Sequence, residues 1–368
     1  MVLRKEYDMT ILLLAVVLTC FGVVMVYSSS SIMAAKRFGD DLYFLKRQGL
    51  YAVLGFALMA AVMHLDYHHL RRLVIPFFLC CAVLLVAVLI PGIGSHAGGA
   101  ARWIRLPGFS VQPAELAKLG LILYMAHSLA KKKEKIKSFK FGFIPYMVVL
   151  AVLLLLMLLQ PDLGGALTLG AVAMVMLLVA GTRLSYLMSV VILALPFLYF
   201  AVMNVAYRRK RIMAFLNPWE DPTNTGFQII QSWIAFGTGG LFGNGLGEGK
   251  QKLFYLPEAH TDFIFSVVGE ELGFAGVLVI TAMFLVLVMR GMRASLGAPD
   301  DFGRYLAFGV TLLLGLQAFV NIAVVMGMLP TKGLALPFLS YGGTSLLTTL
   351  MSVGILLNIS SQASGEAR

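Results

Sequence analysis

Long apolar stretches separated by short polar segments dominate the chain. A helix needs about 20 mainly apolar residues to cross a lipid bilayer. The stretches that meet or approach this length lie at residues 9–29, 48–65, 73–91, 112–130, 142–159, 164–181, 184–203, 263–289, 304–328 and 335–359. The pattern predicts an all-α integral membrane protein with about ten transmembrane helices, forming a single polytopic domain over residues 1–368. The first stretch is too long for the apolar core of a signal peptide, so we expect it to be an uncleaved anchor.

The lysines and arginines of the short loops predict the orientation. These residues gather on the cytoplasmic side of membrane proteins. With the N-terminus inside, the inner segments contain more of them than the short outer segments, mainly because of the run at 131–140. We therefore expect both termini to be cytoplasmic.

Two of the expected outer loops are long. They cover residues 91–111 and about 204–262. Loops longer than about 15 residues are usually functional or disordered. The second loop is rich in Gly, Asn, Pro and Trp, and residues 227–236 have the apolar spacing of a helix. We therefore expect a large structured outer loop between the seventh and eighth spans.

Composition supports the membrane assignment. The chain is 59% hydrophobic and 13% charged, whereas soluble globular proteins contain about 25% charged residues. The formal net charge of +11 suits a protein that faces anionic lipid or a phosphate-bearing substrate, although topological Lys and Arg explain it equally well. Cys20, Cys80 and Cys81 lie in apolar runs and offer neither a disulfide framework nor metal-ligand spacing.

The most polar stretch at a membrane edge is 255–263, where the large outer loop meets the eighth span. Ionisable groups there are costly unless they are paired, hydrated or used. Asp262, or Thr261, can cap the helix that follows, and Asp262 can also act as a general base toward a substrate hydroxyl. Glu258 can be a second base, a metal ligand or a solvated loop residue. His260 can bond its own loop or touch substrate.

Two pairs of charged residues fall within predicted spans. Glu115 and Lys118 lie three residues apart on one helix face, as an ion pair that neutralises two costly charges or as part of the wall of a hydrated cavity. Glu270 and Glu271 face the bundle or a cavity, unless 263–268 is a short surface helix and the span starts later. Asp162, in a tight outer turn, is a turn or cap residue, or lines the same cavity.

Three outer segments offer possible contacts for an anion. The basic run 207–211 is either a solvated face or a phosphate clamp that includes Arg208 and Arg211. The glycine-dense run 236–250 either approaches an anion with its backbone or is an irregular loop with positive φ angles. The prolines and glycines of 329–345 predict non-helical backbone that lines a cavity. Within that last segment, the candidate substrate contacts are Lys332, Ser340 and Gly342.

These features together predict an outer-face cavity that contains a carboxylate and several cations. Such a cavity fits an enzyme that acts on a lipid-linked anion, and it fits a transporter of one.

Several of these motifs resemble the SEDS family (shape, elongation, division and sporulation). The matching stretches lie at 112–118, 160–164, 239–247, 252–273 and 329–344. The resemblance extends over essentially the whole chain. Pro257-Glu258-Ala259-His260-Thr261-Asp262 and Pro330-Thr331-Lys332-Gly333 are more similar to the division branch of the family than to the elongation branch.

The resemblance implies a peptidoglycan glycosyltransferase in the bacterial inner membrane that polymerises lipid II during septal cell-wall synthesis. It implies a class B penicillin-binding transpeptidase and other divisome proteins as partners, with no nucleic acid. The family's proposed catalytic aspartate falls on Asp262, in a site on the outer face. The alternatives are a lipid II flippase and the elongation-type polymerase.

The reaction that the resemblance implies transfers a glycan from a polyprenyl pyrophosphate to the 4-hydroxyl of lipid II. The leaving pyrophosphate needs cations, which Arg208, Arg211, Lys332 or a divalent metal such as Mg or Mn can supply. The hydroxyl needs a base, for which one carboxylate suffices, and we expect inversion at the anomeric carbon.

Overall fold

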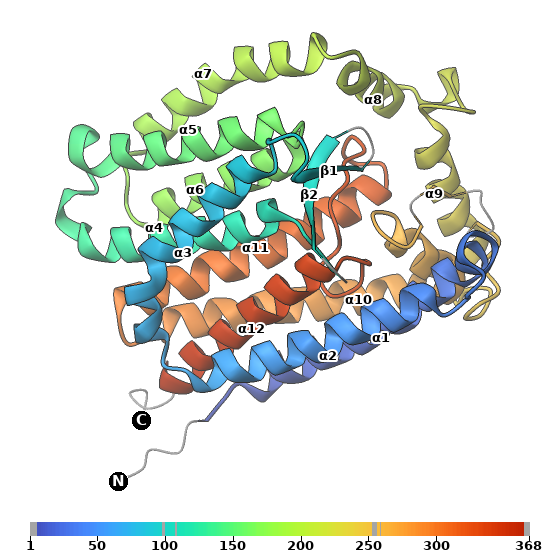
Figure 1. The fold of residues 1–368 in the computed structure, drawn as a ribbon, viewed down its shortest axis with the longest axis horizontal. Helices are drawn as coiled ribbons and strands as arrows, with labels where there is room; N and C mark the ends of the chain where they lie inside the picture. Colours follow the sequence, from blue (N-terminus) through green and yellow to red (C-terminus); the bar gives the residue numbers. More distant parts are fainter. Residues whose placement is uncertain (1–5, 98–99, 107–108, 252–255, 258, 364–368) are drawn as a thin grey trace.

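The computed structural model describes residues 6–97, 100–106, 109–251, 256–257 and 259–363. Its long helices follow the predicted spans (Figure 1). They are α1 (Met9–Phe38), α2 (Tyr43–His64), α3 (Tyr67–Ala87), α4 (Pro113–Lys131), α5 (Ile144–Leu159), α6 (Leu163–Val179), α7 (Leu184–Met203), α10 (Ile264–Leu296), α11 (Asp301–Val325) and α12 (Gly343–Ala363). The short elements are α8 (Ala206–Leu216), α9 (Phe227–Gly239) and the single turns η1 (Lys133–Lys135), η2 (Phe139–Phe143) and η3 (Pro218–Glu220).

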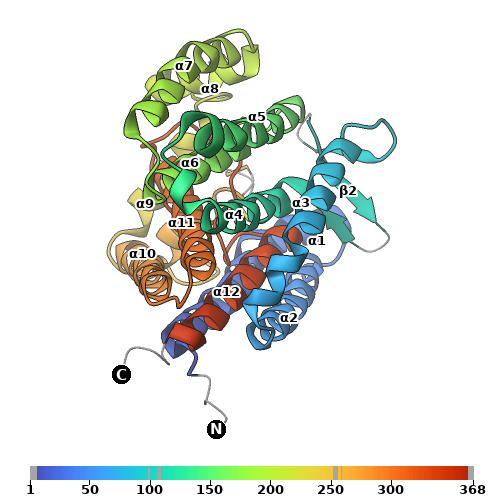
Figure 2. The same ribbon diagram turned by 90° about the vertical axis from the view of Figure 1, so that its left-hand side faces the viewer.

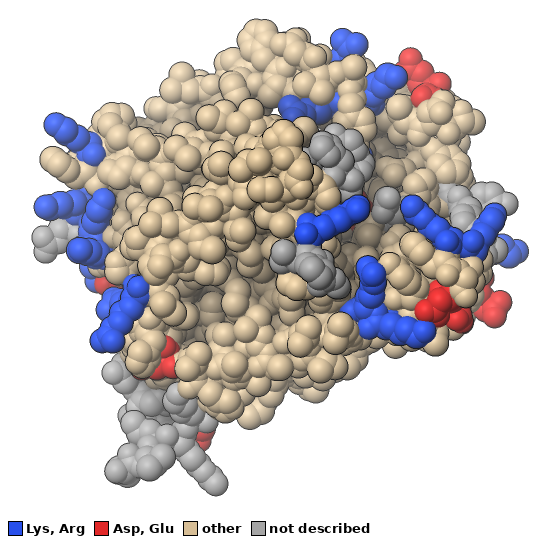
Figure 3. Space-filling view, in the orientation of Figure 1, with Lys and Arg blue, Asp and Glu red and all other residues tan. Residues whose placement is uncertain are grey.

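The length and apolar composition of the helices identify a multi-pass membrane protein. Seven helical segments of the described chain are long and apolar enough to span a bilayer: α1, α3, α5 with η2, α7, α10, α11 and α12. Helix α6 is apolar but shorter. On the face drawn in Figure 3, Lys and Arg gather toward the ends of the long helices and leave a wide band without them. A band of this kind is what a hydrocarbon layer requires.

The centre of the bundle consists of α4, α11 and α12. In the apolar windows of α12 and α11, 83% and 67% of the residues are buried, whereas only 6% are buried in α7. Helix α2 packs along α12, α3 along α4, and α1 against α2 and α10. Helix α7 lies at the periphery beyond α5 and α6 (Figure 2). The polar residues carried by α4, α11 and α12 are therefore enclosed by other helices.

The first long outer loop contains a small β-sheet, so the all-α prediction is incomplete. Strands β1 (Gly94–Ala97), β2 (Ala100–Leu106) and β3 (Phe109–Val111) form an antiparallel sheet in the order β1-β2-β3. Gly94 is opposite Ile104, and Ile104 is opposite Val111. The sheet gives hydrogen-bond partners to backbone groups that lie outside the helices. The Thr344 hydroxyl connects the end of the sheet to α12 by donating to the Ser110 carbonyl at 3.1 Å.

The second long loop is mostly helical. The helix predicted at 227–236 is confirmed as α9. The basic run at 207–211 is not a loop, because it lies on α8. The exposed apolar residues Tyr207, Met213 and Leu216 of α8 suit a helix that lies in the membrane interface.

Helix α10 is broken at Gly273, whose φ is 65° and ψ is −164°. The segment Ile264–Glu271 before the break is buried in protein. Of the two alternatives for Glu270 and Glu271, the short surface helix is wrong because this segment is buried. Backbone amides of Asn244 and Gly245 donate to the carbonyls of Glu270 and Glu271 at 3.0 Å each, which satisfies acceptors that the break leaves open.

Candidate active site

Two non-helical segments meet at the end of the bundle where α10 and α12 begin. One precedes α10 (residues 259–263), and the other joins α11 to α12 (residues 326–342). The buried Ser340 hydroxyl donates to the Thr261 carbonyl at 2.6 Å and accepts from the Leu336 amide at 2.8 Å. The Tyr341 amide donates to the His260 carbonyl at 2.9 Å. Ser340 therefore links the two segments. The prediction of non-helical backbone at 329–345 is confirmed for 329–342, but residues 343–345 belong to α12.

Two buried amide side chains fix these segments to the helices. Asn321 of α11 donates from Nδ2 to the Asp262 carbonyl at 2.9 Å and to the Leu334 carbonyl at 2.6 Å. Gln48 of α2 donates from Nε2 to the Ser340 carbonyl at 3.3 Å. Neither residue was among those predicted from the sequence. The available signal was a carboxamide inside an apolar span, which is costly without partners.

The Asp262 side chain points toward Gly333. A Cβ atom built on Gly333 would lie 2.9 Å from Asp262 Oδ2, so the absence of a side chain there makes room for the carboxylate. The cap predicted for Thr261 or Asp262 is wrong. Helix α10 begins at Ile264, its N-cap position is Phe263, and no side-chain cap bond forms at that position. Asp262 itself is partly buried.

Lys332 precedes Gly333 and is partly buried. Burial lowers the pKa of Lys332 below its ordinary value of 10.5, and the nearby Asp162 carboxylate opposes that shift. A Cβ atom on Gly164 would lie 3.7 Å from Lys332 Cδ, so the lysine stem packs on the first turn of α6. Asp162 caps that helix, accepting from the Gly165 amide at 3.1 Å, as one of its predicted roles required.

The two candidate arginines of α8 bond to different parts of the molecule. Arg211 donates from Nη1 to the Thr331 carbonyl at 2.9 Å, which brings its guanidinium next to the residue that precedes Lys332. Arg208 instead donates to the Ala201 carbonyl of α7 at 2.8 Å. Of the two, only Arg211 is bonded to the segment that carries Lys332.

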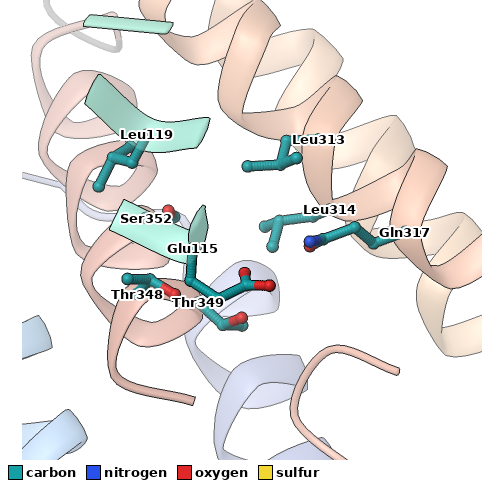
Figure 4. Close-up of a pocket in the computed structure, with 8 residues that line it drawn as sticks. All are labelled: Glu115, Leu119, Leu313, Leu314, Gln317, Thr348, Thr349 and Ser352. Atoms are coloured by element: carbon teal, nitrogen blue, oxygen red, sulfur yellow. The ribbon is translucent and has the colours of Figure 1, made fainter. Parts of the chain in front are cut away.

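Glu115 and Lys118 form the predicted ion pair, with Lys118 Nζ 2.7 Å from Glu115 Oε1. Lys118 is buried. Glu115 also borders a cavity of about 10 Å³, where its carboxylate points toward Gln317 of α11 (Figure 4). The other lining residues shown are Leu119, Leu313, Leu314, Thr348, Thr349 and Ser352. This space holds about one water molecule.

The glycine-dense segment after α9 donates backbone hydrogen bonds to a carboxylate of the same chain. Gly240, Gly243, Gly245 and Gly247 have positive φ angles, as the irregular-loop interpretation predicted. The Lys250 amide donates to Glu270 at 2.7 Å. The anion that the amides at the end of this segment bind is therefore the Glu270 carboxylate of the same chain.

The remaining candidates are placed as follows. The His260 ring packs against Phe44 at 4.7 Å. Gly342 is buried directly before α12. Glu258 lies outside the described residues. Among the described residues, no group of three or more His, Cys, Asp and Glu side chains is arranged to hold a metal ion.

The arrangement places the Asp262 carboxylate beside Gly333, which follows the partly buried cation Lys332 in the chain, at the end of the bundle where α10 and α12 begin. A carboxylate can accept a proton from a hydroxyl. A cation in a poorly hydrated position can stabilise charge that develops on a phosphate oxygen. The site therefore suits transfer to a hydroxyl with an anionic leaving group.

Comparison with known proteins gives a consistent result. Residues 8–365 match the FTSW_RODA_SPOVE family model, described as "Cell cycle protein". A "Probable peptidoglycan glycosyltransferase FtsW" of Geobacter metallireducens is 66% identical over 98% of this chain and 96% of its own length. "Stage V sporulation protein E" of Bacillus subtilis is 44% identical over 97% of this chain and 98% of its own.

Solved structures share the fold. A chain from "Structural coordination of polymerization and crosslinking by a peptidoglycan synthase complex" has a TM-score of 0.80 and 31% identity, covering 98% of this chain and 99% of that chain. The rod shape determining protein RodA of Thermus thermophilus has a TM-score of 0.72 and 29% identity, covering 96% and 97% of the two chains.

Proposed function

Since the chain belongs to the SEDS family of cell cycle proteins, is most like FtsW and is a peptidoglycan glycosyltransferase, we propose that it polymerises lipid II with Asp262 as the general base. The observation that carries the proposal is the Asp262 carboxylate facing Gly333, which directly follows the partly buried Lys332 in the chain. This pairing offers a base for the incoming hydroxyl and a positive charge for the outgoing pyrophosphate.

In the proposed reaction, the 4-hydroxyl oxygen of lipid II attacks the anomeric carbon of the growing glycan. The bond from that carbon to the polyprenyl pyrophosphate breaks, and the pyrophosphate leaves with the electron pair. Asp262 takes the hydroxyl proton. Attack opposite to the leaving group converts the α-linked donor into a β-1,4 bond.

The cations have separate proposed roles. Lys332 faces the pyrophosphate, and Arg211 supports the same segment through the Thr331 carbonyl. A divalent cation such as Mg or Mn can add positive charge at the pyrophosphate when it is bound there. Thr261 and Ser340 hold the two segments in register through their mutual hydrogen bond. The remaining proposed substrate contacts are Glu258, His260, Arg208, Glu115, Lys118 and Gly342.

The cellular setting belongs to the same proposal. We place the protein in the bacterial inner membrane with ten spans, both termini in the cytoplasm, the large loop between spans seven and eight, and the site outside. Its proposed partners are a class B penicillin-binding transpeptidase and other divisome proteins. The similarity to FtsW supports a septal role. Depletion in the source bacterium tests this role, since filamentation supports division and rounding supports elongation.

The general base is tested with the purified full-length Asp262→Asn variant and its transpeptidase partner in proteoliposomes containing lipid II. A general base contributes about 10²- to 10⁴-fold, so we expect glycan synthesis to fall by at least about 100-fold while thermal unfolding is unchanged. Asp221→Asn, which alters another outer-loop carboxylate, serves as the matched control. Near wild-type synthesis by Asp262→Asn contradicts the proposal.

The same proteoliposomes distinguish the flippase alternative. Polymer formed without added translocation machinery supports the glycosyltransferase. Lipid II translocation without polymer supports a transporter instead.

A further inference from the structure

A cluster of aromatic rings extends from the candidate site to the outer surface. Its members are Phe38, Tyr43, Phe44, His260 and Tyr341, which we call the aromatic cluster. Phe44 is the centre, with ring centroids 4.7 Å from His260, 4.9 Å from Tyr341 and 5.2 Å from Tyr43. Phe38 stacks on Tyr43 at 4.1 Å. The cluster therefore connects the end of α1 and the start of α2 to both segments of the site.

The far end of the cluster is its most exposed part. Phe44 is only 8% exposed and Phe38 is 45% exposed. Tyr43, His260 and Tyr341 are partly buried. His260 lies two residues before Asp262 in the chain. The rings thus form a continuous row that begins near Asp262 and ends in a stacked pair of which Phe38 is exposed.

Charged residues surround the exposed end of this path. The segment from Lys36 to Arg47 contains four cations and two carboxylates. The Arg47 guanidinium lies 4.5 Å above the Tyr43 ring, and that of Arg37 lies 5.6 Å from Phe38. Figure 3 shows acidic and basic side chains gathered at this end of the molecule. So many charges indicate that the α1–α2 turn sits in water rather than among lipid tails.

Aromatic rings among charged groups are well suited to sugars. A pyranose ring presents an apolar C–H face that packs on an aromatic ring, while its hydroxyl and amide groups bond to polar neighbours. The excess of cations suits the carboxylates of peptide-bearing sugars. The ring that a sugar unit can cover is Phe38, because Tyr43 stacks on Phe38 and has Arg47 over its ring, and Phe44 is buried.

We propose that the exposed part of the aromatic cluster, Phe38 and Tyr43 with Arg47, is a subsite for the growing glycan strand. The inference rests on the proposed glycan transfer at Asp262. The subsite binds sugar units that have already been joined, and so keeps the strand on the enzyme between successive additions. The first coupling of two lipid II molecules does not need it, because that donor has no preceding sugar units to occupy it.

The test compares glycan length with the rate of the first coupling. Phe38→Leu and Tyr43→Leu, alone and together, keep apolar volume but remove the rings. With purified full-length protein, its partner and lipid II, we expect each to shorten the mean strand about threefold to tenfold, in line with the energy of one aromatic contact. The first coupling should change less than twofold. Tyr43→Phe should keep the wild-type length.

A matched control separates a sugar subsite from an interfacial aromatic belt. Tyr199 and Phe200 also form an exposed ring pair, with ring centroids 5.9 Å apart. They lie near the C-terminal end of α7, which leads into the large loop. Tyr199→Leu with Phe200→Leu should leave strand length unchanged. Unchanged length in the Phe38→Leu, Tyr43→Leu double variant, or equal shortening in the control, overturns the proposal.

A binding measurement gives an answer even if polymerisation is weak. The probe is a lipid-free tetrasaccharide of alternating N-acetylglucosamine and N-acetylmuramic acid, observed by saturation-transfer NMR with detergent-purified protein. We expect transfer to the wild type and to Asp262→Asn, and a loss of at least threefold in the double variant. Equal transfer to the double variant contradicts the subsite. Activity in Asp262→Asn would contradict the general base alone.

Discussion

At the scale of single residues, the position of the Asp262 carboxylate depends on Gly333. A methyl group there would come within 2.9 Å of Oδ2 and would displace the carboxylate. Because a misplacement of about 1 Å can cost about 100-fold in rate, we expect Gly333→Ala to lower lipid II polymerisation by about 10- to 100-fold with little change in thermal unfolding. Gly49→Ala is the control, since no atom lies within 4 Å of its added Cβ. Full activity of Gly333→Ala would show that the carboxylate is not held there during catalysis.

Lys332 predicts the alkaline side of the pH profile. Its pKa is lowered by burial, so it loses its charge below its usual value of 10.5 as the pH rises. If this charge stabilises the pyrophosphate, the polymerisation rate falls on that alkaline limb. Lys332→Arg keeps the charge at high pH, and we expect its alkaline limb to move to higher pH while the acid limb, where the base becomes protonated, stays in place. An unchanged alkaline limb would assign it to another group.

The sequence identified some site residues better than others, for a physical reason. Asp262 and Lys332 stand out because a charge at a membrane edge is costly and needs an explanation. Asn321 and Gln48 were missed because a neutral carboxamide in an apolar span indicates that it needs partners but not which ones. Their role depends on which backbone carbonyls the fold brings within reach, and those carbonyls come from distant segments.

At the scale of elements, the junction between the glycine-dense segment and α10 requires close backbone contact. Gly243 has φ of 81°, and a Cβ there would collide with the Glu271 carbonyl. Gly247 has φ of 87°, but nothing lies within 4 Å of its Cβ. We expect Gly247→Ala to cost about 1–2 kcal/mol through its backbone angle alone.

Gly243→Ala should cost more, because the two backbones must also separate. The unfolding midpoint of each variant in detergent, monitored by size-exclusion chromatography, measures the difference in stability. Equal midpoints for the two variants would show that the contact is not needed for stability.

Sequence patterns predicted the long helices and α9 but not the sheet or the break in α10. Apolar periodicity reports the face that an element buries, and this is strong over a span of about 20 residues. Strands β1–β3 are short and pair with each other rather than with a patterned core. The break at Gly273 depends on partners supplied by residues 240–245, which a local pattern does not reveal.

At the scale of the whole molecule, the proposed ten-span topology predicts which surfaces are accessible from each side. Lys137 and Lys210 are both exposed. We expect a membrane-impermeant maleimide to label Lys210→Cys in intact spheroplasts, and to label Lys137→Cys only after the membrane is opened. The wild type, which has three cysteines in apolar stretches, gives the background. Labelling of both variants in intact spheroplasts would contradict the topology.

The broken helix also bears on biogenesis. An unbroken helix of 33 residues would be about 50 Å long, well beyond a hydrocarbon layer of about 30 Å. Its outer part carries Glu270 and Glu271, whose backbone and side-chain partners come from segments that the ribosome makes earlier. In the proposed topology, the large loop is exported first and this part of α10 docks against it afterwards. We expect chains that fail to export it to leave two carboxylates without partners near lipid, where membrane proteases can recognise them as misassembled.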